Sequence, residues 1–99
     1  SELFKACELS QTKKAIYLIK NGTNIHYVGK KGRTSLHVAC YNGLYDVVDA
    51  LISAGADVNA VDENLNTPLL YTIYGYDKFK NTCTNHTKQK IIKFVIRQL

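Results

Sequence analysis

The strongest constraint on this sequence is that it repeats itself at an interval of 33 residues. Residues 3–7 (LFKAC) align with residues 36–40 (LHVAC), and residues 17–22 (YLIKNG) align with residues 50–55 (ALISAG). Units of this length bury their hydrophobic faces by stacking on their neighbours rather than by folding alone. The 99 residues therefore make a single domain of about three units, with approximate bounds 1–28, 29–61 and 62–99.

Each unit has the pattern of two short helices followed by a turn. Thr67 stands directly before Pro68, which is the usual pairing of an N-cap hydroxyl with a proline in the first helical position. Gly22 and Gly55 follow the second helices of their units, where a left-handed residue commonly ends a helix. Apolar residues recur at helical spacing in the second helix of the middle unit, at Val47, Val48, Leu51 and Ile52.

The middle unit resembles an ankyrin repeat. Residues 32–40 (GRTSLHVAC), the paired apolar residues of the second helix and residues 55–60 (GADVNA) carry the resemblance. It implies an all-α fold, an ankyrin-repeat solenoid of helix-turn-helix units joined by short β-hairpin loops. The first unit resembles the shortened opening repeat of such arrays. The third unit departs from the pattern at Leu70, where a histidine is expected, and at Leu65, where the hairpin usually has a glycine.

The third unit also contains an insertion. Its second helix, at residues 90–96, follows the equivalent residues 46–52 by 44 positions instead of 33. The added residues lie near 77–87 and are polar, which predicts an enlarged surface loop between the two helices. The last helix carries several apolar residues and no hairpin follows it, so we expect the chain to be part of a longer array.

Charge is unevenly distributed along the chain. The formal net charge is +5, but the first and last thirds each carry +5 while the middle third carries −5. This distribution lacks the uniform basic stripe that would favour a nucleic acid as partner. No apolar run approaches the roughly 20 residues that span a bilayer, so we expect no membrane insertion. Three cysteines are too few for a disulfide framework, which favours a cytoplasmic or nuclear location.

No residue pattern indicates catalysis, and we expect neither an enzyme nor a cofactor. His37 with Cys40, and Cys83 with His86, have the local spacing of zinc-binding pairs. The resemblance instead gives His37 the role of hydrogen-bonding the turn and makes Cys40 a small buried residue, so no metal is expected. Asn59 resembles the asparagines that an oxygen-dependent hydroxylase modifies in ankyrin hairpins, although the same residues belong to the ordinary ankyrin consensus.

The remaining residues predict a binding surface. In ankyrin repeats the exposed positions of the concave face lie on the first helices and at the hairpin tips. Tyr41 and Tyr74 hold equivalent positions in successive units, and tyrosine is enriched among residues that dominate protein interfaces. The predicted protein-binding residues are Lys30, Lys31, Arg33, Val38, Tyr41, Asn42, Glu63, Asn64, Asn66, Tyr71 and Tyr74.

We therefore expect a non-catalytic protein-protein interaction module that binds a protein partner on its concave face and is itself a monomer. Two alternatives remain open at this point. The chain could be a nucleic-acid-binding array that uses the basic tip and the insertion, or a structural spacer within a larger multidomain protein. A fold of this kind does not by itself name the partner.

Overall fold

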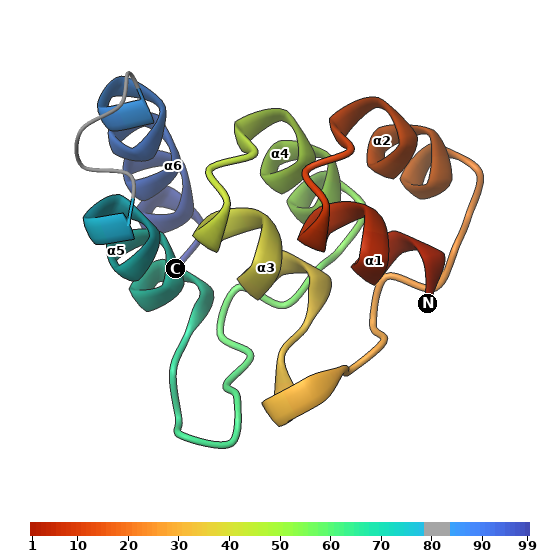
Figure 1. The fold of residues 1–99 in the computed structure, drawn as a ribbon, viewed down its shortest axis with the longest axis horizontal. Helices are drawn as coiled ribbons and strands as arrows, with labels where there is room; N and C mark the ends of the chain where they lie inside the picture. Colours follow the sequence, from red (N-terminus) through yellow and green to blue (C-terminus); the bar gives the residue numbers. More distant parts are fainter. Residues whose placement is uncertain (79–83) are drawn as a thin grey trace.

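The computed structural model describes the backbone of residues 1–78 and 84–99 and the side chains of residues 1–75 and 89–99. In chain order the helices are α1 Glu2–Glu8, α2 Thr12–Lys20, the 3₁₀ turn η1 Lys30–Gly32, α3 Ser35–Tyr41, α4 Tyr45–Ser53, α5 Pro68–Lys78 and α6 Thr84–Gln98. The α-helices form two rows, with α1, α3 and α5 in one row and α2, α4 and α6 in the other (Figure 1). Each helix contacts the other helix of its own unit and its neighbours along the row. This is the stacked helix-turn-helix solenoid that the sequence predicts.

The helix starts follow from local hydrogen bonding. The Thr67 hydroxyl accepts a hydrogen bond from the backbone N–H of Leu70 at 3.4 Å, so the predicted cap before Pro68 is confirmed. The Thr34 hydroxyl caps α3 by accepting a hydrogen bond from the backbone N–H of His37. In return, Nδ1 of the His37 ring accepts from the backbone N–H of Thr34. These reciprocal bonds use two backbone donors that a helix start otherwise leaves unpaired.

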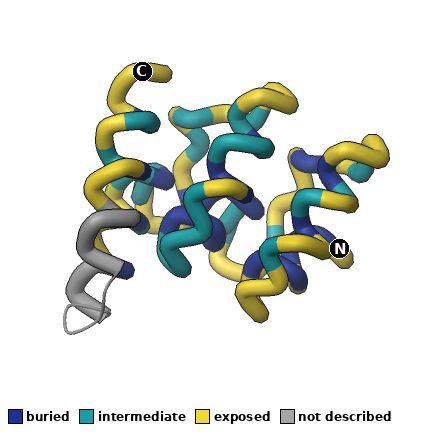
Figure 2. The backbone as a smooth tube through the Cα atoms, turned by 90° about the horizontal axis from the view of Figure 1, so that it is seen from above, coloured by how far each residue is buried: buried dark blue, intermediate teal, exposed yellow. Residues whose placement is uncertain are grey.

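The core lies between the two rows and between successive units, where buried residues concentrate (Figure 2). Leu36 and Ala39 in α3 and Val48 and Leu51 in α4 are at most 2% exposed. The apolar pattern predicted for the second helix of the middle unit is thereby confirmed at Val48 and Leu51. Burial raises the pKa of the Cys7 thiol to about 12, so this cysteine is an unreactive core residue at neutral pH. Cys40, its equivalent 33 residues later, is also completely buried.

Two hairpin tips project on the same side of the molecule, beyond the row of α1, α3 and α5 (Figure 1). We call residues 29–33 tip 1 and residues 62–66 tip 2. In tip 1 the backbone N–H of Gly29 donates to the carbonyl oxygen of Arg33 at 2.8 Å, and in tip 2 Asp62 donates to Asn66 in the same way at 3.1 Å. The Glu63 N–H of tip 2 also donates to a backbone oxygen of tip 1 at 2.9 Å, so the two tips support each other.

Leu65 has the backbone conformation of the glycine that it replaces. Its φ is 64°, and Gly32, the equivalent residue of tip 1, has φ 76°. A left-handed conformation costs a residue with a Cβ about 1–2 kcal/mol. The Leu65 side chain is 75% exposed and therefore recovers little of this cost by packing. Tip 2 keeps the left-handed turn conformation of tip 1 although it has a leucine in place of the glycine.

Leu65→Gly is therefore expected to raise the free energy of unfolding by about 1 kcal/mol, because it relieves the left-handed strain. Urea denaturation followed by circular dichroism measures this change. Asn64→Gly is the matched control, since Asn64 is exposed in the same tip and does not have a positive φ. That control is expected to lower stability slightly. A lower stability for Leu65→Gly would contradict the strain argument.

The predicted surface loop near 77–87 is only partly correct. The helix α5 continues to Lys78 and α6 already begins at Thr84, so both ends of this segment are helical. Residues 79–83 lie outside the described part of the chain. Polar composition led to the error, because an exposed helical turn and a loop are equally polar. Among the described helices, none combines the length and hydropathy that a bilayer-spanning segment needs.

Candidate functional site

Two adjoining depressions lie where α3 and α5 meet the hairpin tips. The larger encloses about 350 Å³ and the smaller about 190 Å³. Both are lined by Arg33, Tyr41 and Tyr71, so they form one continuous surface, which we call the tip-helix face. The remaining lining residues are Lys31, Asp62, Asn64, Asn66 and Tyr74 in the larger depression and Glu8, Val38 and Asn42 in the smaller.

The structure thus brings together all the predicted binding residues except Lys30 and Glu63. Lys30 lines a separate depression beside α1, together with Phe4 and Tyr27. Glu63 is exposed in tip 2 and lines neither of the two depressions.

One predicted binding residue is much less accessible than expected. Val38 is only 6% exposed and belongs to the hydrophobic core, because α3 is packed between α1 and α5. It reaches the smaller depression only at its edge. The Asn42 side chain is also fixed against α1, because its amide donates to the Cys7 carbonyl oxygen at 2.9 Å.

Three tyrosines form a connected aromatic surface across α3 and α5. The ring centroids of Tyr41 and Tyr71 are 6.2 Å apart, and those of Tyr71 and Tyr74 are 6.1 Å apart. Tyr74 is 45% exposed, whereas Tyr41 and Tyr71 are half-buried. Tyr71 also packs edge-on against His37 at a centroid distance of 4.9 Å. The outermost ring is therefore open to solvent, and the middle ring joins this surface to the core.

Asp62 organises tip 2 and was not predicted as part of the site. One carboxylate oxygen accepts from the backbone N–H groups of Asn64 and Asn66, each at 2.9 Å. The other accepts from the Tyr71 hydroxyl at 2.5 Å and from the Asn66 amide at 3.4 Å. Burial raises the pKa of Asp62, but these hydrogen bonds, led by that from Tyr71, outweigh it and lower the pKa to about 2.

The residue type does contain a signal for this role, because Asp and Asn favour turns. An Asp or Asn side chain that accepts from the backbone N–H two residues later forms an Asx-turn, and three such bonds occur among the described residues. Asn24 accepts from His26 and Asp57 accepts from Asn59 in the same way that Asp62 accepts from Asn64. The bond to Tyr71 lacks such a local signal, because it joins residues on two different elements.

The tyrosine hydroxyls are oriented by tip 2. The Tyr71 hydroxyl donates a hydrogen bond to Asp62, and the Tyr74 hydroxyl donates one to the side-chain oxygen of Asn66 at 3.1 Å. Burial and the adjacent Asp62 carboxylate raise the pKa of Tyr71 to about 12. Tyr71 is therefore a structural link of the face as well as part of its surface.

His37 is a neutral, buried connector between α3 and tip 2. Its Nδ1 accepts from the Thr34 backbone N–H at 3.1 Å, so the proton is on Nε2, which donates to the Asn66 carbonyl oxygen at 2.8 Å. Burial lowers the pKa of His37 below its ordinary value. Both ring nitrogens are thus engaged, as the resemblance implied, and neither is available to a metal. Cys83 and His86, the other pair weighed for zinc, lie outside the residues whose side chains are described.

Stability is expected to fall as the pH drops below about 6.5, because His37 must stay neutral to accept from Thr34. The folded-state pKa of His37 is lowered, so its contribution is complete above the unfolded pKa and is lost as the pH falls toward the folded pKa. Urea denaturation at pH 7.5 and pH 5.5 measures the loss. His37→Gln is expected to be less stable at neutral pH and to lose most of this dependence, whereas His26→Gln should retain it. The same change in stability between the two pH values for the unmodified chain and for both variants would contradict the assignment to His37.

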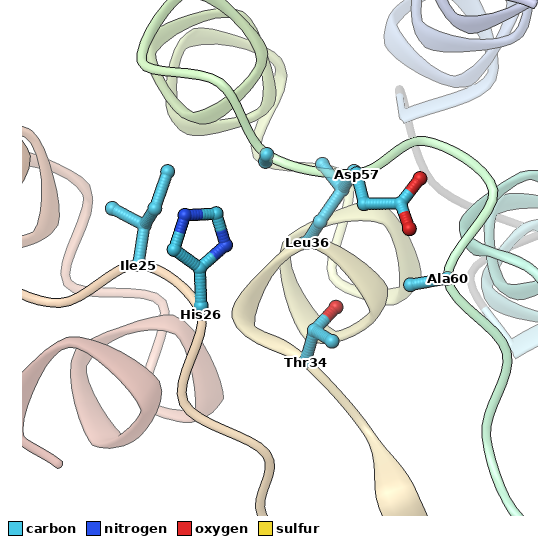
Figure 3. A pocket seen from close by; sticks show the side chains of 7 residues that line it. Ile25, His26, Thr34, Leu36, Asp57 and Ala60 are labelled. Atoms are coloured by element: carbon cyan, nitrogen blue, oxygen red, sulfur yellow. The ribbon is translucent and has the colours of Figure 1, made fainter.

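A further cavity of about 190 Å³ lies on the loops that follow α2 and α4, at the start of α3 (Figure 3). Figure 3 shows the His26 ring beside Ile25, while the Asp57 carboxylate points toward Ala60. Asp57 also accepts a hydrogen bond from its own loop at 2.8 Å. These two titratable groups do not converge. Within the residues whose side chains are described, no three His, Cys, Asp or Glu residues gather around a possible metal position.

Comparison with known proteins agrees with the repeat geometry. The family model for ankyrin repeats, described as three copies, matches residues 2–62. The Hydra vulgaris tyrosine-protein kinase HTK16 is 35% identical over 72 residues, which is 70% of this chain and 10% of the kinase. The Fowlpox virus putative ankyrin repeat protein FPV234 is 44% identical over 61 residues, which is 58% of this chain and 14% of the viral protein.

The human protein phosphatase 1 regulatory subunit 27 is 41% identical over 51 residues, which is 52% of this chain and 33% of that subunit. The matched part of the chain thus spans between a tenth and a third of each of these relatives. The family model covers more than half of the chain, and the two rows of helices with projecting tips have the architecture of that family. The chain belongs to the ankyrin-repeat family.

Proposed function

We propose that this chain is a non-catalytic module that binds a protein partner through the tip-helix face. Ankyrin repeats are generic protein-protein interaction modules. The observation that carries the proposal is the convergence of Arg33, Tyr41, Tyr71 and Tyr74 on two adjoining depressions. Arginine and tyrosine, together with tryptophan, are enriched among the residues that dominate binding energy at protein interfaces.

The rigidity of the face supports the same proposal. Hydrogen bonds from Tyr71, Asn64 and Asn66 to Asp62 fix tip 2, and the Tyr74 hydroxyl is held by Asn66. A preformed surface loses less conformational entropy when a partner binds than a surface that must first become ordered. Binding is therefore favoured even though the two depressions are shallow.

The protonation states of the face favour binding over catalysis. Asp62 has a pKa of about 2 and accepts four hydrogen bonds, so it is a poor proton acceptor at neutral pH. His37 is buried behind Tyr71 with both nitrogens bonded. Asp62 and His37 thus maintain the shape of the tip-helix face.

Photocrosslinking in a lysate of the native host tests this proposal. A photoreactive phenylalanine analogue replaces Tyr74 in one variant and Tyr17 in the other, because both tyrosines are exposed but Tyr17 lies on α2 in the opposite row. We expect a crosslinked protein from position 74 and none from position 17. Crosslinks only from position 17, or only to nucleic acid, would contradict the proposal.

A further inference from the structure

In the larger depression, the main hydrogen-bond acceptors are occupied by groups of the chain itself. Its strongest acceptor, the Asp62 carboxylate, already receives bonds on both oxygens. The side-chain oxygen of Asn66 also receives a hydrogen bond, from the Tyr74 hydroxyl. Asp62 and Asn66 therefore have few acceptor positions left for the positively charged side chains of a partner.

The two cations of the same depression, Lys31 and Arg33, keep most of their donors unused within the part of the chain that the structure describes. Arg33 gives its Nε proton to the Lys30 carbonyl oxygen at 3.2 Å, which leaves the terminal nitrogens of its guanidinium group for another acceptor. No described carboxylate lies within 4 Å of the charged nitrogens of Lys31 or Arg33. Glu8 and Glu63, which lie nearby in the chain's fold, are both exposed and neither pairs with these cations.

The position of the two cations is fixed by backbone geometry. Lys31 has φ 60°, and its carbonyl oxygen accepts from the Glu63 N–H at 2.9 Å. Gly32 is so close to tip 2 that a Cβ there would meet the Glu63 nitrogen at 3.0 Å. The tip that carries Lys31 and Arg33 is thus seated against tip 2, and both side chains line the depression beside the tyrosine rings.

We infer that the tip-helix face recognises a peptide segment with a carboxylate side chain, which binds Lys31 and Arg33 while the neighbouring residues pack on the tyrosines. This inference rests on the proposed function and specifies the chemistry of the partner. Two cations with free donors, next to a carboxylate whose acceptors are occupied, complement an acceptor with a negative charge. The guanidinium group of Arg33 can bind both oxygens of one carboxylate.

Nuclear magnetic resonance titration of the isotope-labelled chain tests the inference. The probe is a ten-residue peptide with alternating glutamate and serine, and its matched control has glutamine in place of glutamate. We expect the glutamate peptide to shift the amide signals of tip 1, tip 2, α3 and α5, and the glutamine peptide to bind at least tenfold more weakly. Lys31→Gln with Arg33→Gln should weaken the glutamate peptide at least tenfold, and Arg33→Lys should have an intermediate effect.

Lys13→Gln with Lys20→Gln is the control for net charge, because it removes two exposed cations from α2 in the opposite row. Binding of the glutamate peptide to this variant should stay within twofold of the unmodified chain. Equal binding of both peptides would overturn the acidic preference, and the photocrosslinking experiment would still decide the proposed function. Equal weakening by the two double variants, or tighter binding of a twelve-nucleotide single-stranded DNA on the same face, would also overturn it.

Discussion

Asp62→Ala is expected to lower the free energy of unfolding by about 3 kcal/mol, which corresponds to a fall of roughly 15 °C in the melting temperature of a domain of this size. The substitution leaves the backbone donors of Asn64 and Asn66 and the hydroxyl of Tyr71 without their acceptor. Tip 2 and α5 then lose their strongest polar connection. Urea denaturation at pH 7 measures the loss.

Asp57→Ala is the matched control for this prediction. Asp57 also forms an Asx-turn, but it is exposed, and among the described residues its side chain accepts only from the Asn59 N–H. Its replacement is expected to cost less than about 1 kcal/mol. A similar loss for both variants would mean that the turn alone, and not the network around Tyr71, explains the contribution of Asp62. Because the pKa of Asp62 is lowered to about 2 in the folded state, its contribution should be complete at neutral pH and should be lost progressively as the pH falls from about 4 to about 2.

Tyr41→Ala combined with Tyr74→Ala is expected to weaken partner binding by more than tenfold while the far-ultraviolet circular dichroism stays nearly unchanged. Burial of each ring by a partner would contribute about 1–3 kcal/mol to binding. The two rings occupy equivalent positions on α3 and α5, and neither is completely buried by the chain itself. Calorimetry with the crosslinked partner, once identified and purified, measures the effect.

Two further variants serve as controls for this double substitution. Tyr17→Ala removes an exposed tyrosine from α2 and should leave the affinity unchanged. Tyr71→Ala should instead lower stability markedly, because Tyr71 donates to Asp62 and packs against His37. Retained affinity in the Tyr41 and Tyr74 double variant would contradict the binding role of these rings. A large fall in the melting temperature of this double variant would show that the rings of Tyr41 and Tyr74 belong to the core.

The elements that repeat were predictable from the sequence. The interval of 33 residues and the cap at Thr67 predict helices that the structure contains, with their apolar stripes in the core. Gly22 and Gly55 have φ of 80° and 99°, as expected for residues that end a helix in the left-handed conformation. These features depend on local physics, since capping, helical periodicity and backbone conformation involve residues a few positions apart.

The contacts between units were not predictable in the same way. Tyr71 was predicted as a surface residue because of its position in the repeat, yet its hydroxyl binds Asp62 across two elements. Val38 was predicted to be exposed, yet the packing of α3 between its neighbours nearly buries it. The third unit's longer helices were also missed, because polarity distinguishes exposed from buried residues and does not distinguish a loop from an exposed helix.

Hydrogen-deuterium exchange of the chain, alone and bound to its partner, tests the central claim most directly. The account predicts that binding slows amide exchange in residues 29–42 and 62–75, which contain both tips, α3 and the first turns of α5. Amide exchange in α2, which carries the exposed Tyr17, and in α4 should stay unchanged. Protection confined to the row of α2, α4 and α6, with tips 1 and 2 exchanging as fast as in the unbound chain, would contradict the assignment of the tip-helix face as the binding surface.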